Sequence, residues 1–233
     1  MFALSPVELE ALGLSLKVGL WAVVGSLPLG LFVAWVLARC RFPGHGVLNA
    51  VVHLPLVLPP VVVGYVLLLV LGRNGVLGAP LHEWLGWSFA FTWEGAAVAS
   101  AVVAFPLLVR SIRLSLELVD RRLETAARTL GAGRLDVFWN VTVPLVLPGI
   151  VTGAVLAFAR SIGEFGATIT FVSNIPGVTQ TLPLALYTAV QTPGGDAIAL
   201  RLVVISCVLA FGALAASEIL SRHVRRRIMG SGA

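Results

Sequence analysis

The sequence predicts an all-α protein, a polytopic membrane helical bundle with about five transmembrane helices. Of its 233 residues, 58% are hydrophobic and only 12% are charged, and the mean hydropathy is +0.97. Soluble globular domains carry roughly 25% charged residues, so this composition is far from theirs. Apolar runs near the roughly 20 residues that cross a bilayer core recur along the chain. We therefore interpret residues 1–233 as a single membrane domain with no soluble domain attached.

Five apolar runs define the expected spans. Four of them are near the length that a bilayer core requires. The third is short unless residues 89–94 and 110–116 extend its helix. In order, the runs are about Leu12–Ala38, Val47–Leu71, Gly95–Val109, Leu147–Ile169 and Leu200–Leu220.

The loop charges predict the orientation of the bundle. The loops after the second and fourth spans offer only Arg73 and Arg201. Since positive residues stay on the cytoplasmic side, we expect the N-terminus outside and the C-terminus in the cytoplasm. This topology explains the net charge of +5 more simply than nucleic-acid binding does, because aromatic residues near the arginines are sparse. The arginines after the first, third and fifth spans are Arg39, Arg41, Arg110, Arg113, Arg121, Arg122, Arg128, Arg134, Arg222, Arg225, Arg226 and Arg227.

The sequence offers no site for chemistry of its own. There is no G-x-x-x-x-G-K-[ST] motif, and the only lysine is Lys17, so no phosphate-cradling loop with its lysine can form. The four histidines are scattered and make no cluster with metal-ligand spacing. Cys40 and Cys207 lie at or inside apolar spans, so we interpret them as small buried hydrophobic side chains. We expect no catalytic residue, metal or cofactor in this chain.

The longest polar segment between spans, about residues 117–144, has the pattern of two short helices. Asp120 can cap the start of the first, and Gly131 sits where a left-handed C-terminal cap is needed. Pro144 is expected to close the second. We interpret the first helix as a docking helix that fits a groove on a cytoplasmic partner. The alternative is a helical hairpin that lies on the membrane surface. The apolar faces of the two helices are formed by Val119, Leu123, Ala126 and Leu130, and by Leu135, Phe138 and Trp139.

The second span contains three prolines, Pro55, Pro59 and Pro60. Each removes a backbone donor inside a membrane helix, and the freed carbonyls must be satisfied by neighbouring groups or by water. Broken helices of this kind often border a substrate pathway. The alternative is a kink that only improves packing.

The fourth span carries two charges. With Pro148 in the first turn, Arg160 lies about 18 Å along the helix, near the middle of the bilayer, and Glu164 lies one turn further on the same face. A lone charge there costs about 3 kcal/mol or more, which a mutual ion pair reduces. The pair is either a charge-compensated lock between helices or a source of positive potential for an anion pathway. A stripe of small residues lets another helix approach closely: Gly149, Gly153, Ala157 and Ser161.

The 117–144 segment resembles the permease loop of ABC importers, which is patterned Glu-Ala-Ala, three residues, Gly, nine residues, Ile-x-Leu-Pro. The Glu position of that pattern is Thr125, with Glu124 one residue early, and valines replace the Ile and the Leu. The runs His53–Tyr65, Ala157–Gly177 and Gln191–Gly195 are similar to molybdate permease subunits of ABC importers, a resemblance that covers nearly the whole chain. The matching positions of the loop are Ala126, Ala127, Gly131, Val141, Val143 and Pro144.

The resemblance implies a permease subunit that moves a tetrahedral oxyanion, molybdate above all, across the inner membrane of a bacterium. It implies two permease copies, two separate ATPase subunits that bind ATP and Mg, and an external substrate-binding protein. Sulfate and tungstate permeases look related but less close. We assign coupling to the ATPase to Glu124, Thr125, Ala126, Ala127, Gly131 and Pro144. We assign the translocation pathway to Pro59, Pro60, Arg160, Ser161 and Glu164.

Two further expectations concern assembly and the outer face. One subunit of five spans has few helices with which to surround a pathway, and the small-residue stripe needs a partner. A two-fold homodimer is the simplest assembly that closes the pathway. The polar segment 168–196, with a short helix at Leu182–Val190, is expected to line the outer mouth and meet the binding protein; the alternative is a plain connecting loop. Trp84, Trp87 and Trp93 are expected to anchor the membrane interface.

A secondary anion transporter is the alternative function. It would need coupling-ion carboxylates or inverted repeats within its spans. Glu164 is the only clearly intramembrane acid, and the sequence contains no such repeat.

Overall fold

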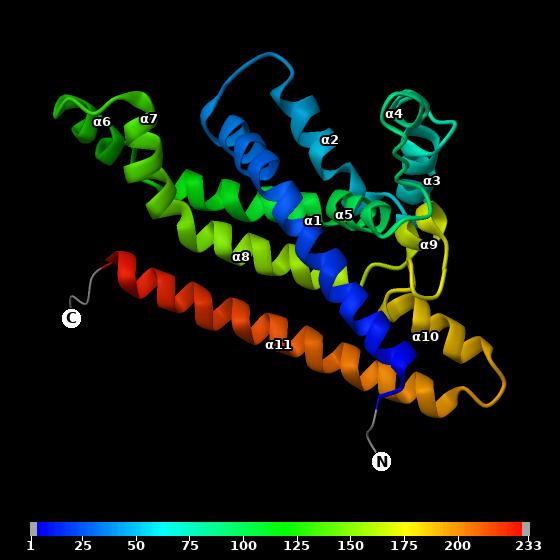
Figure 1. Ribbon diagram of the computed structural model, residues 1–233. Coiled ribbons are helices and arrows are strands. Elements are labelled where there is room, and N and C mark those ends of the chain that lie inside the picture. Colours follow the sequence, from blue (N-terminus) through cyan, green and yellow to red (C-terminus); the bar gives the residue numbers. More distant parts are fainter. Residues whose placement is uncertain (1–3, 230–233) are drawn as a thin grey trace.

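The computed structural model describes residues 4–229, except for the side chains at positions 217 and 221–229. Within this range the regular secondary structure is helical, with eleven α-helices, one π-helical turn and no strand, so the predicted all-α fold is confirmed. Figure 1 shows long helices that cross one another in a bundle, with the short helices gathered at its two ends.

Four helices are long and apolar enough to cross a membrane, and two further apolar helices that meet at a bend of 115° make a fifth span when the pair is counted as one. The single spans are α1 (Pro6–Arg39), α5 (Trp93–Leu118), α8 (Val143–Ile162) and α11 (Asp196–Met229). The bent span consists of α2 (His45–Val57) and α3 (Pro60–Leu71). The shorter elements are α4 (Gly78–Leu85), α6 (Arg121–Thr129), α7 (Arg134–Val137), the π-helical turn η1 (Phe138–Thr142), α9 (Gly166–Val172) and α10 (Leu182–Gln191).

Local chemistry explains where several of these helices begin. Pro6 occupies the first turn of α1, and the side chains of Ser5 and Glu8 cap each other's backbone amides. Thr92 caps α5 by accepting a hydrogen bond from the Gly95 amide at 3.1 Å. Helix α5 extends the short third span at both ends, as its flanking residues allowed, and α10 matches the short helix expected before Pro193.

The fourth span differs from its expected form at both ends. Helices α7, η1 and α8 run on without a break, so the prediction that Pro144 closes a separate helix is wrong. In the wider π turn the Val143 amide bonds to the Phe138 carbonyl, and Pro144 follows in the first turn of α8, where its missing N–H costs little. Pro148 therefore lies inside α8 rather than in its first turn. At the other end the helix stops at Ile162, and the expected continuation to Ile169 is a separate helix, α9.

Helices α1, α5 and α8 form the centre of the bundle, and α11 lies along α8 (Figure 1). The small residues of α8 face α5 of the same chain: a Cβ on Gly149 would collide with Ser115, and one on Gly153 would lie 3.0 Å from Ser111 Cβ. Ser111 also donates a hydrogen bond to the Gly149 carbonyl at 3.0 Å. The expectation that this stripe requires a second copy is thus wrong, because the chain's own α5 fills it.

The start of α1 is tied to the last two helices of the chain. Glu8 is buried and accepts a hydrogen bond from Arg201 Nε of α11 at 2.8 Å. The Leu182 amide, at the start of α10, donates to the Ser15 hydroxyl at 2.7 Å. These two contacts fix one end of the bundle, where α10 packs against α1 and α11.

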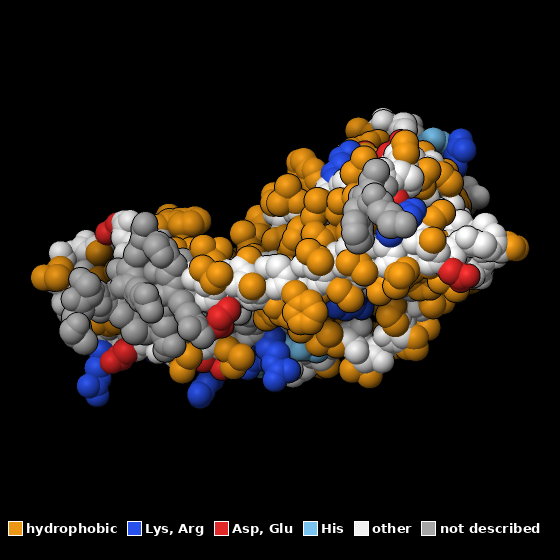
Figure 2. Space-filling view, turned by 90° about the horizontal axis from the view of Figure 1, so that it is seen from below, with side chains coloured by type: hydrophobic (Ala, Val, Ile, Leu, Met, Phe, Trp, Pro, Cys, Tyr) orange, Lys and Arg blue, Asp and Glu red, His pale blue; other side chains and the backbone are white. Residues whose placement is uncertain are grey.

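The outer surface of α11 is apolar and is not covered by the rest of the chain. In Figure 2, which views the molecule from the α11 side, hydrophobic side chains spread over the middle of the face. Val208 and Phe211 are among the exposed side chains of this helix. Cys207 is exposed there and Cys40 is half-buried, so the prediction of buried cysteines is wrong, although both are free thiols as expected.

The three outer tryptophans differ in their surroundings. Trp84 and Trp87 are exposed, whereas Trp93 is half-buried. Its ring lies 3.5 Å from the ammonium of Lys17 and next to the ring of Trp21, so it also joins α5 to α1.

The second halves of two interrupted helices, α3 and α9, pack directly on each other. A Cβ on Gly64 would lie 2.5 Å from the Ala167 carbonyl oxygen, and one on Gly166 would lie 2.8 Å from Pro60 Cβ. Both positions therefore need glycine for reasons of space. Behind this contact, Phe171 and Val172 of α9 are fully buried against α5 and α3.

We expect Gly64→Ala to destabilise the protein by about 1–3 kcal/mol, because the added methyl meets rigid backbone of α9. The measurement is the thermal unfolding midpoint of the full chain in detergent. Gly25→Ala is the matched control: this glycine is also inside a membrane helix, but a Cβ there meets nothing within 4 Å. The control should be neutral or stabilising by up to about 1 kcal/mol. Equal midpoints for the two variants would contradict the close α3–α9 contact.

Candidate functional site

The predicted site residues fall in two separate places. One group surrounds the breaks in the two interrupted spans, between α2 and α3 and between α8 and α9. The other lies in the segment of residues 117–144, at the opposite end of α8. Each place is described in turn.

Glu164 lies in the break between α8 and α9, and its carboxylate serves both sides of the break. Oε2 lies 2.7 Å from Arg160 Nη1, and Oε1 accepts a hydrogen bond of 2.8 Å from the Ala167 amide in the first turn of α9. The Glu164 side chain is 1% exposed and the Arg160 side chain 31%. The predicted Arg160–Glu164 pair is thus confirmed as a contact. Its setting was predicted wrongly, because Glu164 lies beyond the end of α8 rather than on it.

The carboxylate explains why the span breaks at this point. An acidic group is favourable beside the free amides at the start of a helix, and here it replaces the backbone carbonyls that a continuous helix would supply. The Thr168 hydroxyl donates a hydrogen bond to the Phe165 carbonyl at 2.9 Å. The break therefore pairs the Ala167 amide and the Phe165 carbonyl inside the protein, as a membrane-embedded segment requires.

The prolines of the other interrupted span adjoin this break. Pro59 caps α3 and Pro60 is its first residue, and the 115° bend confirms the prediction of a broken helix. Pro60 lies against Gly166, two residues after Glu164. The structure therefore brings the two breaks together through Pro60 and Gly166.

Two side chains near the breaks retain polar groups that could meet a solute. Ser161 is buried, and its hydroxyl has no hydrogen-bond partner among the described residues. Arg160 uses only Nη1 in its ion pair, and its side chain is partly exposed. Since a guanidinium has five N–H donors in a fixed plane, it can hold Glu164 and still offer donors to an oxyanion.

The coupling segment forms the helix that its pattern predicts. The Asp120 side chain caps α6 by accepting from the Arg122 amide at 2.9 Å, and Gly131 has a φ of +92°, so both predicted caps are confirmed. The Ala132 amide bonds to the Ala127 carbonyl at 3.1 Å, the 6→1 bond of a Schellman motif. The apolar face of α6 is left uncovered: Leu123 is 50% and Leu130 89% exposed.

Glu124 points the other way, toward the bundle. Its Oε1 accepts from Arg39 Nη2 at 2.9 Å and from the Thr142 hydroxyl at 3.0 Å. The side chains of Arg39 and Glu124 are 10% and 17% exposed, so this ion pair is largely desolvated. We call Arg39, Glu124 and Thr142 the coupling junction, because they join the end of α1, the helix α6 and the residue before α8.

This junction was not predicted from the sequence. Arg39 was expected only to mark the topology, and no motif selects Thr142. The ion pair joins residues 85 positions apart, and no local pattern links them. Of the other predicted coupling residues, Thr125 and Ala126 are exposed, and Ala127 is half-buried on the junction side of α6.

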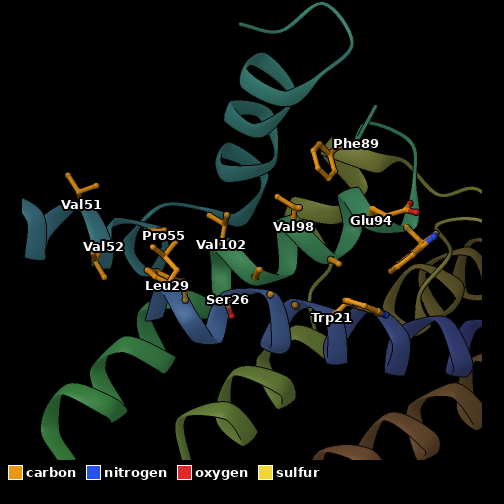
Figure 3. Close-up of a pocket in the computed structure, with 16 residues that line it drawn as sticks. Trp21, Ser26, Leu29, Val51, Val52, Pro55, Phe89, Glu94, Val98 and Val102 are labelled. Carbon is orange, nitrogen blue, oxygen red and sulfur yellow. The ribbon is translucent and has the colours of Figure 1, made fainter. Parts of the chain in front are cut away.

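A groove of about 570 Å³ lies between α1, α2 and α5 but contains none of the predicted site residues. Figure 3 shows Leu29, Val52, Pro55 and Val102 around it, with Glu94 toward one end. This apolar lining suits hydrocarbon and not a hydrated anion. Within the described part of the chain, no three His, Cys, Asp or Glu side chains are grouped so that they could hold a metal ion.

Comparison with known proteins identifies the family that this chain resembles. Residues 26–226 match the family described as binding-protein-dependent transport system inner membrane component. The molybdenum transport system permease protein ModB of Escherichia coli (strain K12) is 61% identical over 224 residues, covering 96% of this chain and 98% of that protein. The protein of the same name in Haemophilus influenzae is 54% identical over 222 residues, covering 95% of this chain and 97% of its own length.

The fold also matches solved structures. The crystal structure of a bacterial alginate ABC transporter, in complex with alginate pentasaccharide-bound periplasmic protein, contains a similar chain. The TM-score is 0.71, the match covers 98% of this chain and 82% of that chain, and the sequences are 17% identical. Identity this low supports the fold alone.

We expect Glu164→Gln to destabilise the protein by about 3 kcal/mol, because it leaves the Arg160 charge unpaired while keeping an oxygen for the Ala167 amide. The double variant Arg160→Gln/Glu164→Gln should recover most of this loss, since replacing both partners of a buried pair is often nearly neutral. The measurement is the thermal unfolding midpoint in detergent. A double variant no more stable than Glu164→Gln would show that the pairing does not carry the effect.

Proposed function

This chain belongs to the family of binding-protein-dependent transport system inner membrane components, and from that membership we propose that it is the permease subunit through which an ATP-driven importer moves molybdate into the cell. It is a multi-pass inner-membrane transport subunit, and the family implies an ATPase and a substrate-binding protein as its partners. The observation that carries the choice of molybdate is the full-length similarity to molybdenum permeases described above.

The coupling mechanism follows from the two faces of α6. The exposed apolar face with Leu123 and Leu130 docks into a groove on the ATPase, which holds ATP and Mg. The opposite face is fixed to the bundle by the coupling junction. When the ATPase pair closes, α6 moves with it, and the junction passes this movement to α1 and α8 together.

The pathway follows from the two broken spans. Arg160 and Ser161 supply donors to a tetrahedral oxyanion beside the α8–α9 break, and Pro59 and Pro60 keep α2 and α3 bent next to it. A second copy of the chain closes the pathway along a two-fold axis, because one bundle leaves large apolar surfaces such as that of α11 uncovered. Nucleotide and the loaded binding protein each favour the outward-open state, since a ligand shifts an equilibrium only through its differential affinity.

The orientation follows from the charges at the two ends of the bundle. Helices α6 and α7 carry four of the arginines, and Arg39 lies beside them, so this end faces the cytoplasm. The opposite end carries the polar loop after α9, where Asn174, Gln180 and Thr188 hydrogen-bond to one another. This ordered loop and α10 form the outer surface that receives the binding protein. The N-terminus lies on that outer side.

We expect Leu123→Ala/Leu130→Ala to reduce the recovery of the ATPase with the affinity-tagged chain by tenfold or more, because each buried leucine contributes roughly 1.5–3 kcal/mol to an interface. The measurement is co-elution of the ATPase when both are expressed together. Val76→Ala/Leu85→Ala, which shortens two similarly exposed side chains at the other end of the bundle, should leave the recovery unchanged. Unchanged recovery with the α6 variant would contradict docking at this face.

The charge-compensated variant Arg160→Gln/Glu164→Gln tests the pathway. If the variant assembles with its ATPase, we expect ATP-driven molybdate uptake into proteoliposomes to fall by at least about tenfold, because the guanidinium donors are lost. Sulfate at the same concentration should be a weaker substrate of the wild-type complex. Assembly with normal uptake would show that the pair is only a structural lock. Uptake driven by a proton gradient without ATP would contradict the proposed function itself.

A further inference from the structure

A groove of about 840 Å³ lies between α1 and the coupling segment, on the side of α6 away from its exposed apolar stripe. Leu123 and Leu130, which are proposed to meet the ATPase, do not line it. The groove therefore excludes the two leucines of the proposed docking face, although its lining includes Glu124 and Thr125 from the predicted coupling residues. It is bounded by the half of α1 that ends at Arg39 and by α6, α7 and η1.

The two walls of the groove are apolar and rich in aromatic rings. Phe32 of α1 is 61% exposed and Trp139 of η1 is 59% exposed, so neither ring is covered by the rest of the chain. The α1 wall begins at Pro28, eleven positions before Arg39, which corresponds to about 16 Å of helix and so to about half of a bilayer core. The apolar residues that line the groove include Pro28, Leu31, Phe32, Trp35, Phe138 and Trp139.

The rim of the groove is positively charged. Arg121, Arg128 and Arg134 line it, and none of them takes part in the four ion pairs found among the described side chains. The one acidic residue in the lining, Glu124, is already neutralised by Arg39. The rim thus has three arginines whose charges nothing in the groove balances.

We propose that this groove binds one anionic phospholipid, with its phosphodiester headgroup on Arg128 and Arg134 and an acyl chain along Phe32 and Trp35. The groove has an apolar wall that extends into the depth of the hydrocarbon core and a cationic rim at one end. Its occupant must therefore be an amphiphile. Basic pockets between membrane helices are suited to anionic headgroups, and tryptophans favour the boundary between headgroups and acyl chains. A soluble anion would satisfy the arginines but leave the aromatic walls uncovered.

The lipid would lie against the coupling junction. Arg39, Glu124 and Thr142 also line the groove, so a bound acyl chain and headgroup would pack against the contact that joins α6 to α1 and α8. The lipid would therefore stiffen the joint through which α6 is held to the bundle.

The test is native mass spectrometry of the full chain, released from nanodiscs that contain equal amounts of phosphatidylglycerol and phosphatidylcholine. The wild-type chain should retain phosphatidylglycerol in preference to phosphatidylcholine. Arg128→Gln/Arg134→Gln should lower that preference by roughly fivefold for each arginine removed. Arg128→Lys/Arg134→Lys should keep most of it, which separates loss of charge from misfolding.

Arg73→Gln is the control for a single removed charge, because it takes one arginine from an exposed loop at the other end of the bundle. It should leave the lipid preference unchanged. Equal retention of the two lipids by the wild type, or an equal loss in the Arg73 variant, would overturn the proposal. Displacement of the bound phosphatidylglycerol by millimolar inorganic phosphate would also overturn it, and would assign a soluble anion to the rim. Lipid retention is measured without ATP or substrate, so its outcome is independent of the proposed transport function.

Discussion

The hydrogen bond from the Ala167 amide to Glu164 is the contact that allows a membrane helix to be interrupted here. No water is available in a bilayer core, so each broken backbone hydrogen bond needs a partner from the protein. The Glu164 carboxylate supplies one, and Arg160 compensates its charge. Because the break is satisfied in this way, α9 can turn out of line with α8 and pack against α3. The bent second span in turn has a surface to rest on, with Gly64 and Gly166 allowing the close approach.

A single carboxylate also joins several elements at the other end of α8. A single carboxylate oxygen, Glu124 Oε1, accepts from both Arg39 and Thr142 and joins three elements that are distant in the sequence. Loss of one partner of a largely desolvated ion pair strongly destabilises a protein, because the other charge is left buried and unpaired. The apolar face of α6 points away from the bundle. A partner can therefore bind that face while Glu124 keeps the helix fixed to the bundle.

The two ends of the bundle are therefore held differently from its middle. The middle consists of α1, α5 and α8 packed through small residues and aliphatic side chains, which gives close contact with little polarity. Each end carries an ion pair between distant helices, Glu8 with Arg201 at one and Arg39 with Glu124 at the other. Rigid helices that are fixed at their ends by directional contacts can tilt as units.

Much of this arrangement was determined by the sequence alone. The fold class, the bend at Pro59 and the caps at Asp120 and Gly131 depend on local chemistry: hydropathy over a span, a missing amide, a side-chain acceptor, a positive φ. The likeness of the 117–144 segment to a permease loop was equally readable, because that pattern is local.

Only the tertiary structure decided which distant groups meet. It placed α5 against the small residues of α8, turned Glu124 inward to Arg39 across 85 positions, and joined Glu8 to Arg201 across 193. It also ended α8 at Ile162 and carried the helix through Pro144. In each case the outcome depends on whether a donor, an acceptor or free space is brought from another helix. Residue spacing within one segment carries no information about that partner.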